Sequence, residues 1–84
     1  MGVFSKKYIY VDVCFLQGKH PYTYRTNDSS IRINDVVMVP AGVEVKPAIV
    51  SGVKIYKEKD VPVPPDRLKE IIGKADRENR KLFK

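Results

Sequence analysis

The chain has 84 residues, enough for one domain with one hydrophobic core. Its hydrophobic fraction is 43%, and 16 Lys and Arg residues outnumber 10 Asp and Glu residues to give a net charge of +6. The single cysteine, Cys14, excludes an intrachain disulfide and fits a reducing, cytoplasmic setting. The longest apolar run, near 9–16, is far shorter than the ~20 residues that cross a membrane. We expect no signal peptide and no membrane partner.

Side chains in the first part of the chain alternate with the period of two that is typical of β-strands. The alternation predicts one strand over 7–16 and a second over 22–26, which pair as an antiparallel hairpin. A cluster of turn-forming residues over 27–30 follows. Ile31 and Ile33 come next in a short segment that we expect to plug one end of the core.

The stretch over 34–42 is the strongest single signal in the sequence. A polar turn precedes four apolar residues, and the Pro-x-Gly sequence that follows predicts a central strand over 36–39 that Pro40 ends. Gly42 lacks a side chain, so its bare backbone is expected to lie at the surface where a ligand can approach closely.

The next part of the chain predicts the closing strands of a small barrel. A loop or short strand is expected over 43–46, and Pro47 precedes a long strand over 48–56. Gly52 interrupts that strand and predicts a bulge or sharp bend, as closure of a small barrel requires. Strand after strand with short turns favours an antiparallel β-barrel of about five strands.

The last third of the chain changes character. Residues 57–65 are charged and then rich in proline, so they are expected to be extended. From Pro65 onward the apolar residues recur at helical spacing, which predicts one C-terminal α-helix over 65–84 packed on the barrel. The predicted organisation is therefore a flexible lead over 1–7, a mainly β barrel domain over 8–64, and this helix.

Catalytic chemistry is poorly supplied. His20 is the only histidine and stands in a predicted turn, where a solvated side chain is the simpler interpretation. Cys14 lies within an apolar strand and is better interpreted as a structural residue than as a nucleophile. The sequence holds no phosphate-binding loop or metal-binding motif. We therefore expect no enzyme, no cofactor and no metal site.

Binding chemistry is better supplied. Five tyrosines lie in predicted strands, and with nearby basic residues they could stack on bases and hold phosphates. The tyrosines are Tyr8, Tyr10, Tyr22, Tyr24 and Tyr56; the basic residues are Lys19, Arg25, Arg32, Lys46 and Lys54. Tyrosine is also a good strand former, so a purely structural role stays open. The basic residues over 66–84 are interspersed with acidic ones, which is typical of a solvated helix but also suits docking on a partner.

Four short motifs, in order, resemble one known family. They are Tyr22-Thr23-Tyr24, the segment Ile33 to Gly42, the segment Ile49 to Val53, and Leu68-Lys69-Glu70. Together they resemble the N-terminal 3′-DNA-end-binding domain of the primosomal replication-restart helicase PriA. The chain is also similar to small stand-alone proteins of bacteria and their mobile elements. The resemblance implies a barrel fold and a pocket for a 3′-terminal nucleotide, without the ATP-driven helicase body.

Carried over from that family, the nucleotide pocket falls on Tyr22, Thr23, Gly42 and Lys69. Thr23 stands where the family has an aspartate, and Ala41 stands where it has an aromatic residue. The first hypothesis is a nucleic-acid-binding module, for a single strand or a DNA 3′ end, with a contact surface that adds Tyr24 and Arg25. The second is a protein-interaction accessory or inhibitor module of a mobile element. The oligomeric state is left open.

Overall fold

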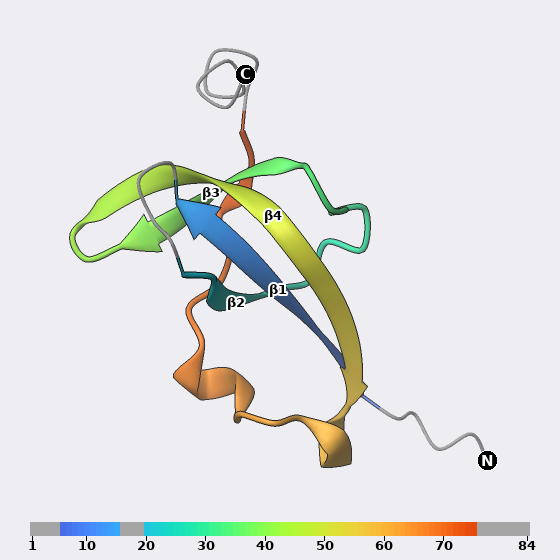
Figure 1. Ribbon diagram of the computed structural model, residues 1–84. Helices are drawn as coiled ribbons and strands as arrows, with labels where there is room; N and C mark the ends of the chain where they lie inside the picture. The colour runs from blue at the N-terminus through green and yellow to red at the C-terminus, as the bar shows by residue number, and fades with distance from the viewer. Residues whose placement is uncertain (1–5, 16–19, 76–84) are drawn as a thin grey trace.

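The computed structural model describes residues 6–15 and 20–75 of the chain. Five strands form one antiparallel sheet in the order β2-β1-β4-β3-β5, which confirms the predicted β class and strand number (Figure 1). The strands are β1 Lys7–Phe15, β2 Tyr22–Thr26, β3 Val36–Ala41, β4 Glu44–Lys57 and β5 Gly73–Lys74, and the 3-10 turns are η1 Glu58–Asp60 and η2 Pro65–Arg67. No helix in this described part is long and apolar enough to cross a membrane.

β1 is an interior strand of the sheet, paired with β2 on one side and with β4 on the other. Its alternation is as predicted, because Val11 and Val13 are fully buried and face the core. β1 begins at Lys7, one residue inside the predicted flexible lead. The core cluster consists of Val11, Val13, Tyr24, Ile31, Val37, Val39, Ala48, Val50 and Ile71. Ile31 is thus buried as expected, whereas Ile33 is exposed.

β3 does not end before Pro40, contrary to the prediction, but continues through it to Ala41. The carbonyl of Pro40 accepts the Tyr24 hydroxyl on the side away from β4, so its missing N–H interrupts no bond of the β3–β4 ladder. A two-residue turn, Gly42-Val43, then leads directly into β4. The predicted break at Pro47 is also wrong, because β4 runs without interruption from Glu44 to Lys57.

The predicted bulge at Gly52 is confirmed. Asp12 is paired with Gly52 and Val13 with Val50, so Ser51 is the extra residue of β4. A Cβ at position 52 would lie 3.3 Å from a carboxylate oxygen of Asp12. The glycine therefore lets β4 bend across β1, and β4 follows a long curve in Figure 1.

The sheet does not close into the predicted barrel. The two ends of the strand order, β2 and β5, share no ladder, and only one parallel bridge, between Arg25 and Glu70, joins β2 to the segment before β5. β5 itself pairs with only two residues of β3. A closed barrel needs a continuous ladder around its circumference, and the described chain supplies too few paired residues on this side.

The predicted C-terminal helix is wrong over the described part of the segment. Only the 3-10 turn η2 is helical there, and 68–75 is extended and bonds to both edges of the sheet. The Ile72 and Ala75 amides each donate to a β3 carbonyl at 2.9 Å. Ile71 and Ala75 are both buried, and a spacing of four fits a helix period and a strand period equally. Residues 76–84 lie outside the described chain.

The segment between β4 and β5 covers the second face of β1. It runs through η1 and η2 along one side of the sheet before it reaches β3 (Figure 1). Tyr10, on that face, is only 3% exposed and donates its hydroxyl to the Val63 carbonyl. The Tyr56 ring meets it edge-on with a centroid distance of 5.3 Å. Burial raises the pKa of Tyr10, so its phenol stays a neutral donor.

Candidate functional site

A cavity of about 440 Å³ lies between β2, the end of β3 and the residues at the end of η2. We call it the seam cavity. Its first wall is Phe15 with Tyr22–Tyr24, its second is Pro40–Gly42, and its third is Arg67–Lys69, the end of η2 and the two residues after it. Residues from four distant parts of the chain therefore meet at the place where the sheet is unpaired.

The seam cavity begins where the backbone hydrogen bonds between β2 and the segment after η2 end. The Arg25 amide donates to the Lys69 carbonyl at 3.0 Å, and the Ile71 amide donates to the Arg25 carbonyl at 2.9 Å. The next bond of a parallel ladder would join the Lys69 amide to the Thr23 carbonyl. No such backbone bond forms between these two described residues. The Thr23 peptide edge and the Lys69 amide therefore face the opening and can hydrogen-bond to a ligand.

Tyr24 forms the inner limit of the cavity. Its ring belongs to the buried core, and its hydroxyl donates to the Pro40 carbonyl at 2.8 Å. This bond stands where a further strand would otherwise pair with β3. Burial raises the pKa of the Tyr24 phenol, which keeps it a neutral donor across the neutral pH range. Tyr24 therefore links β2 to β3 and separates the cavity from the core.

Tyr22 supplies the aromatic surface. Its ring meets Phe15 in an edge-on arrangement, with centroids 5.4 Å apart and an interplanar angle of 62°. The contact fixes the ring, yet Tyr22 is 53% exposed. An immobilised and exposed aromatic face is suited to stacking on a flat π-system such as a nucleobase.

Gly42 stands on the opposite wall at the tip of the β3–β4 hairpin. Its φ is +64°, and it is the first of the two turn residues, the position that a type II′ turn reserves for glycine. No other atom lies within 4 Å of the position that a Cβ would occupy. The prediction of an exposed bare backbone at Gly42 is therefore confirmed.

The third wall is basic. Pro65 begins η2, and two backbone bonds hold the turn, from the Arg67 amide to Pro64 and from the Leu68 amide to Pro65. The turn presents Arg67 and Lys69 as exposed residues at the cavity. None of the residues that line the cavity is Asp or Glu. The seam cavity therefore combines an aromatic face with two cations and no carboxylate.

Five of the six predicted site residues meet in this cavity, namely Tyr22, Thr23, Tyr24, Gly42 and Lys69. Arg25 does not. Its Nε donates to the Leu68 carbonyl at 2.9 Å, and its Nη1 forms an ion pair with Glu70 at 3.2 Å. It lines a second cavity, which shares no lining residue with the seam cavity. The Thr23 hydroxyl donates to the Asp12 carboxylate at 2.7 Å, so its side chain is already bonded.

Sequence reasoning missed Phe15, Pro40, Arg67 and Leu68 as cavity residues. Phe15 lies at the end of the first alternating strand, where its type predicts only burial, and Pro40 predicts a strand end. Arg67 is one of many charged residues in the predicted helix. Only the Pro-x-Gly turn opposite the Tyr-x-Tyr strand could have indicated Pro40 as a wall residue.

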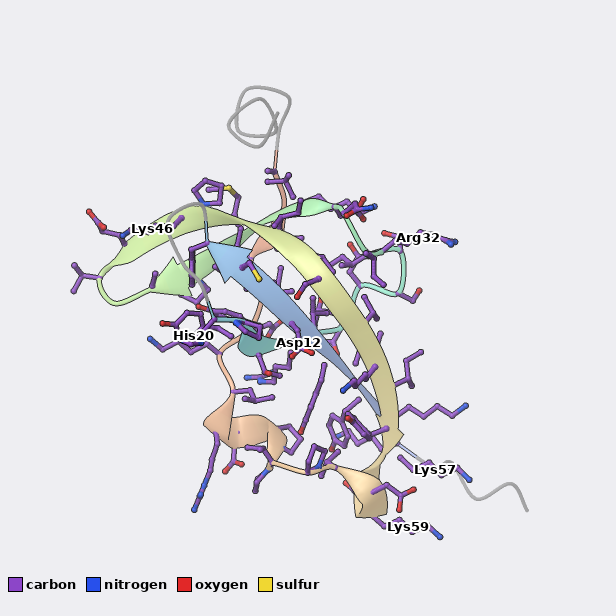
Figure 2. The ribbon with its side chains drawn as sticks, in the orientation of Figure 1. Asp12, His20, Arg32, Lys46, Lys57 and Lys59 are labelled. Carbon is purple, nitrogen blue, oxygen red and sulfur yellow. The ribbon has the colours of Figure 1, made fainter. Side chains whose placement is uncertain are left out.

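The other candidate residues are dispersed. His20 is exposed, and Cys14 is a half-buried free thiol. Arg32 and Lys46 lie on different sides of the molecule and do not share a surface (Figure 2). Lys19 lies outside the described residues. Within 6–15 and 20–75, no three His, Cys, Asp or Glu side chains gather in a way that could hold a metal ion.

Comparison of the chain with protein-family models, with curated protein sequences and with solved structures gave no match. The resemblance to the 3′-end-binding domain therefore stays a prediction.

Proposed function

We propose that this protein is a non-enzymatic module that binds single-stranded nucleic acid in the seam cavity. The lining of the cavity supports this function, since it joins the fixed, exposed Tyr22 ring to Arg67 and Lys69 without any acidic residue. Its volume of about 440 Å³ is within the range of roughly 300–1,000 Å³ that small-molecule sites occupy. One nucleotide is a ligand of suitable size and chemistry.

Each wall has a separate task in this proposal. The Tyr22 ring stacks on a base, a contact that contributes about 1–3 kcal/mol by alanine substitution in other single-strand binders. Lys69 and Arg67 neutralise the adjoining phosphate. The unpaired Thr23 peptide edge and Lys69 amide hydrogen-bond to the base or the sugar, and Gly42 lets the backbone of the second wall approach closely.

A strand end suits the cavity better than the middle of a strand. The bond between Tyr24 and Pro40 bounds the cavity on its inner side, so a terminal nucleotide can fill the cavity without the chain passing through it. This agrees with the 3′-end binding that the family resemblance implies. Because Thr23 replaces the aspartate of that family, recognition of the terminal hydroxyl would depend on backbone groups here.

The protein-interaction hypothesis has one observation in its favour. The β3–β4 hairpin ends in Val43, which is fully exposed, and Val45 beside it is also exposed. Exposed apolar residues on an unpaired hairpin can add to the edge of a partner's sheet. This stays the second candidate, since it leaves the composition of the seam cavity without a role. A cytoplasmic location and a mobile-element origin stay predictions of the sequence.

The direct test is fluorescence anisotropy with a 5′-labelled oligo(dT) of ten nucleotides at low salt. We expect binding with a dissociation constant of ~10⁻⁴–10⁻⁶ M that weakens as salt is added. Blocking the 3′ hydroxyl with a phosphate should weaken binding, whereas a 5′ phosphate on an unlabelled competitor should not. Absence of binding at low salt would contradict the proposal, and equal binding of both 3′ ends would restrict it to single strands in general.

A further inference from the structure

We propose that a strand bound in the seam cavity continues into a second nucleotide subsite beside Tyr8. This inference rests on the proposed function and extends it from one nucleotide to a short strand. The subsite is a cavity of about 230 Å³ formed by the first residues of β1 and the last residues of β2, next to η1, whose Glu58 bonds to Tyr8. It is lined by Lys6, Tyr8, Ile9, Arg25, Thr26 and Asn27.

β2 connects the two cavities. Its residues Tyr22–Tyr24 line the seam cavity, and the residues that follow, Arg25–Asn27, line the second one. Arg25 also bonds to the carbonyl of Leu68, which lines the seam cavity. From Thr23 to Thr26 the strand advances by three residues, or ~10 Å at ~3.3 Å a residue. Stacked nucleotides rise by ~3.4 Å, so about three nucleotide steps join the cavities.

The second cavity offers an aromatic face and a cation together. The Lys6 ammonium lies over the Tyr8 ring at 5.7 Å from its centroid, so a flexible side chain, and no packed part of the core, covers this face of the ring. The Tyr8 hydroxyl donates to Glu58 at 3.2 Å and orients the ring. A phosphate would attract Lys6 from the ring, and a base could then stack in its place.

The polar groups around the ring favour a base over a simple anion. Thr26 already accepts the Asp28 amide at 3.0 Å through its hydroxyl, so it stabilises the turn. Asn27 is exposed, and its amide offers both a donor and an acceptor for the edge of a base. An inorganic anion would use only the cations and would leave the ring and this amide without a role.

Acidic residues limit how strongly this path binds. Glu70 forms an ion pair with Arg25, and the side chains are 37% exposed for Arg25 and 50% for Glu70. Asp12 stands beside Thr23 on the same face. Glu70 therefore competes with a phosphate for the Arg25 guanidinium. Its neutralisation in Glu70→Gln should release Arg25 for the strand and tighten binding.

The test is a length series of oligo(dT), from two to eight nucleotides, measured by competition against the labelled ten-nucleotide strand. For the unaltered protein we expect affinity to rise by about tenfold between two and about five nucleotides and then to level. Tyr8→Ala and Lys6→Ala should each lower the affinity for the hexanucleotide, by up to about tenfold for Tyr8, and leave the dinucleotide unchanged.

Three variants make the interpretation specific. Tyr8→Phe keeps the ring and loses only the bond to Glu58, so it should retain hexanucleotide binding. Glu70→Gln should strengthen it by about two- to threefold. Lys54→Ala removes a cation of β4 outside both cavities and should leave the affinities for the dinucleotide and the hexanucleotide unchanged. Amide spectra of every variant establish that the fold is retained.

The outcomes separate this inference from the proposed function. If the hexanucleotide binds through Tyr22 and Lys69 but is insensitive to Tyr8, Lys6 and Glu70, the second subsite is wrong and the proposed function stands. If affinity does not increase beyond two nucleotides, the subsite is again contradicted. If no length binds at low salt, the proposed function itself fails, and this inference fails with it.

Discussion

The two sides of β2 differ in how completely they are paired. Towards β1, β2 forms five registered pairs, and β1 forms nine more with β4. Towards β3 and β5, β2 has a single bridge at Glu70. On the paired side, apolar residues fill the core; on the open side, aromatic and basic residues line a cavity. Stability is therefore concentrated on the side of β2 that pairs with β1, and unpaired groups that can bind a ligand are concentrated on its open side.

The largest expected effect is on the paired side. Val13 is fully buried on β1, so Val13→Ala should lower the free energy of unfolding by about 2–3 kcal/mol, from lost burial and the cavity left behind. Urea unfolding followed by circular dichroism measures this change. Val43→Ala, at the fully exposed hairpin tip, is the matched control and should change stability by less than ~0.5 kcal/mol. Equal effects of the two variants would contradict the assignment of the core.

The next effect lies on the open side, at Gly42. Gly42→Ala places a side chain in free space but at a φ of +64°, so it should cost about 1–2 kcal/mol through backbone strain alone. Urea unfolding again provides the measurement. Gly73→Ala, where a Cβ also meets nothing within 4 Å and φ is not positive, is the control and should be nearly neutral. Equal losses at the two glycines would show that the turn does not require glycine.

A smaller effect is expected from the hydroxyl that links the two sides. Tyr24→Phe removes the bond to the Pro40 carbonyl and should lower the free energy of unfolding by about 1 kcal/mol. Because this bond closes the inner side of the seam cavity, the variant should also discriminate less between 3′ hydroxyl and 3′ phosphate ends. Tyr22→Phe, at a residue that is 53% exposed, should retain full stability. A Tyr24→Phe protein as stable as the unaltered chain would remove this link from the account.

The smallest effect on stability concerns the buried phenols, and it appears only at alkaline pH. Burial raises the pKa of Tyr10 and of Tyr24 above the ordinary value of 10.0. Each raised pKa stabilises the folded state fully below pH ~10, and this stabilisation is lost as the pH rises through the folded value. Urea midpoints should therefore fall above pH ~10, and the fall should be shallower in Tyr10→Phe. An identical alkaline profile for that variant would contradict the assignment.

The fully paired side is also the part that sequence reasoning predicted well. Alternation over β1 and β2 depends on a period of two that burial of one face imposes, and Gly52 indicates a bulge because a glycine interrupts an otherwise regular strand. In the structure a Cβ at this position would lie only 3.3 Å from the Asp12 carboxylate. The predictions at Pro40 and Pro47 were wrong because a proline lacks only its own N–H. It therefore removes a ladder bond only towards the strand that this N–H would face. Whether a neighbouring strand needs that bond depends on the tertiary arrangement.

The open side was predicted least well. Ile71 and Ala75 satisfy a helix and a strand equally, and only the vacant edge of β3 decides in favour of the extended form. The residues Tyr22, Thr23, Gly42 and Lys69 came from a family resemblance, and the structure brings them together in one cavity. Phe15 and Arg67 could not be predicted, since their meeting depends on where the pairing between Thr23 and Lys69 stops.

The most direct test of a nucleic-acid site in the seam cavity is a titration of the ¹⁵N-labelled protein with oligo(dT) of six nucleotides, followed by amide chemical shifts. We predict that the largest shifts fall on the amides of Thr23, Gly42 and Lys69, while those of Val11 and Val50 on the paired side stay unchanged. Tyr22→Ala should abolish the pattern. Shifts confined to the hairpin tip or spread evenly over the basic residues, or a pattern that survives Tyr22→Ala, would contradict a nucleic-acid site in the seam cavity.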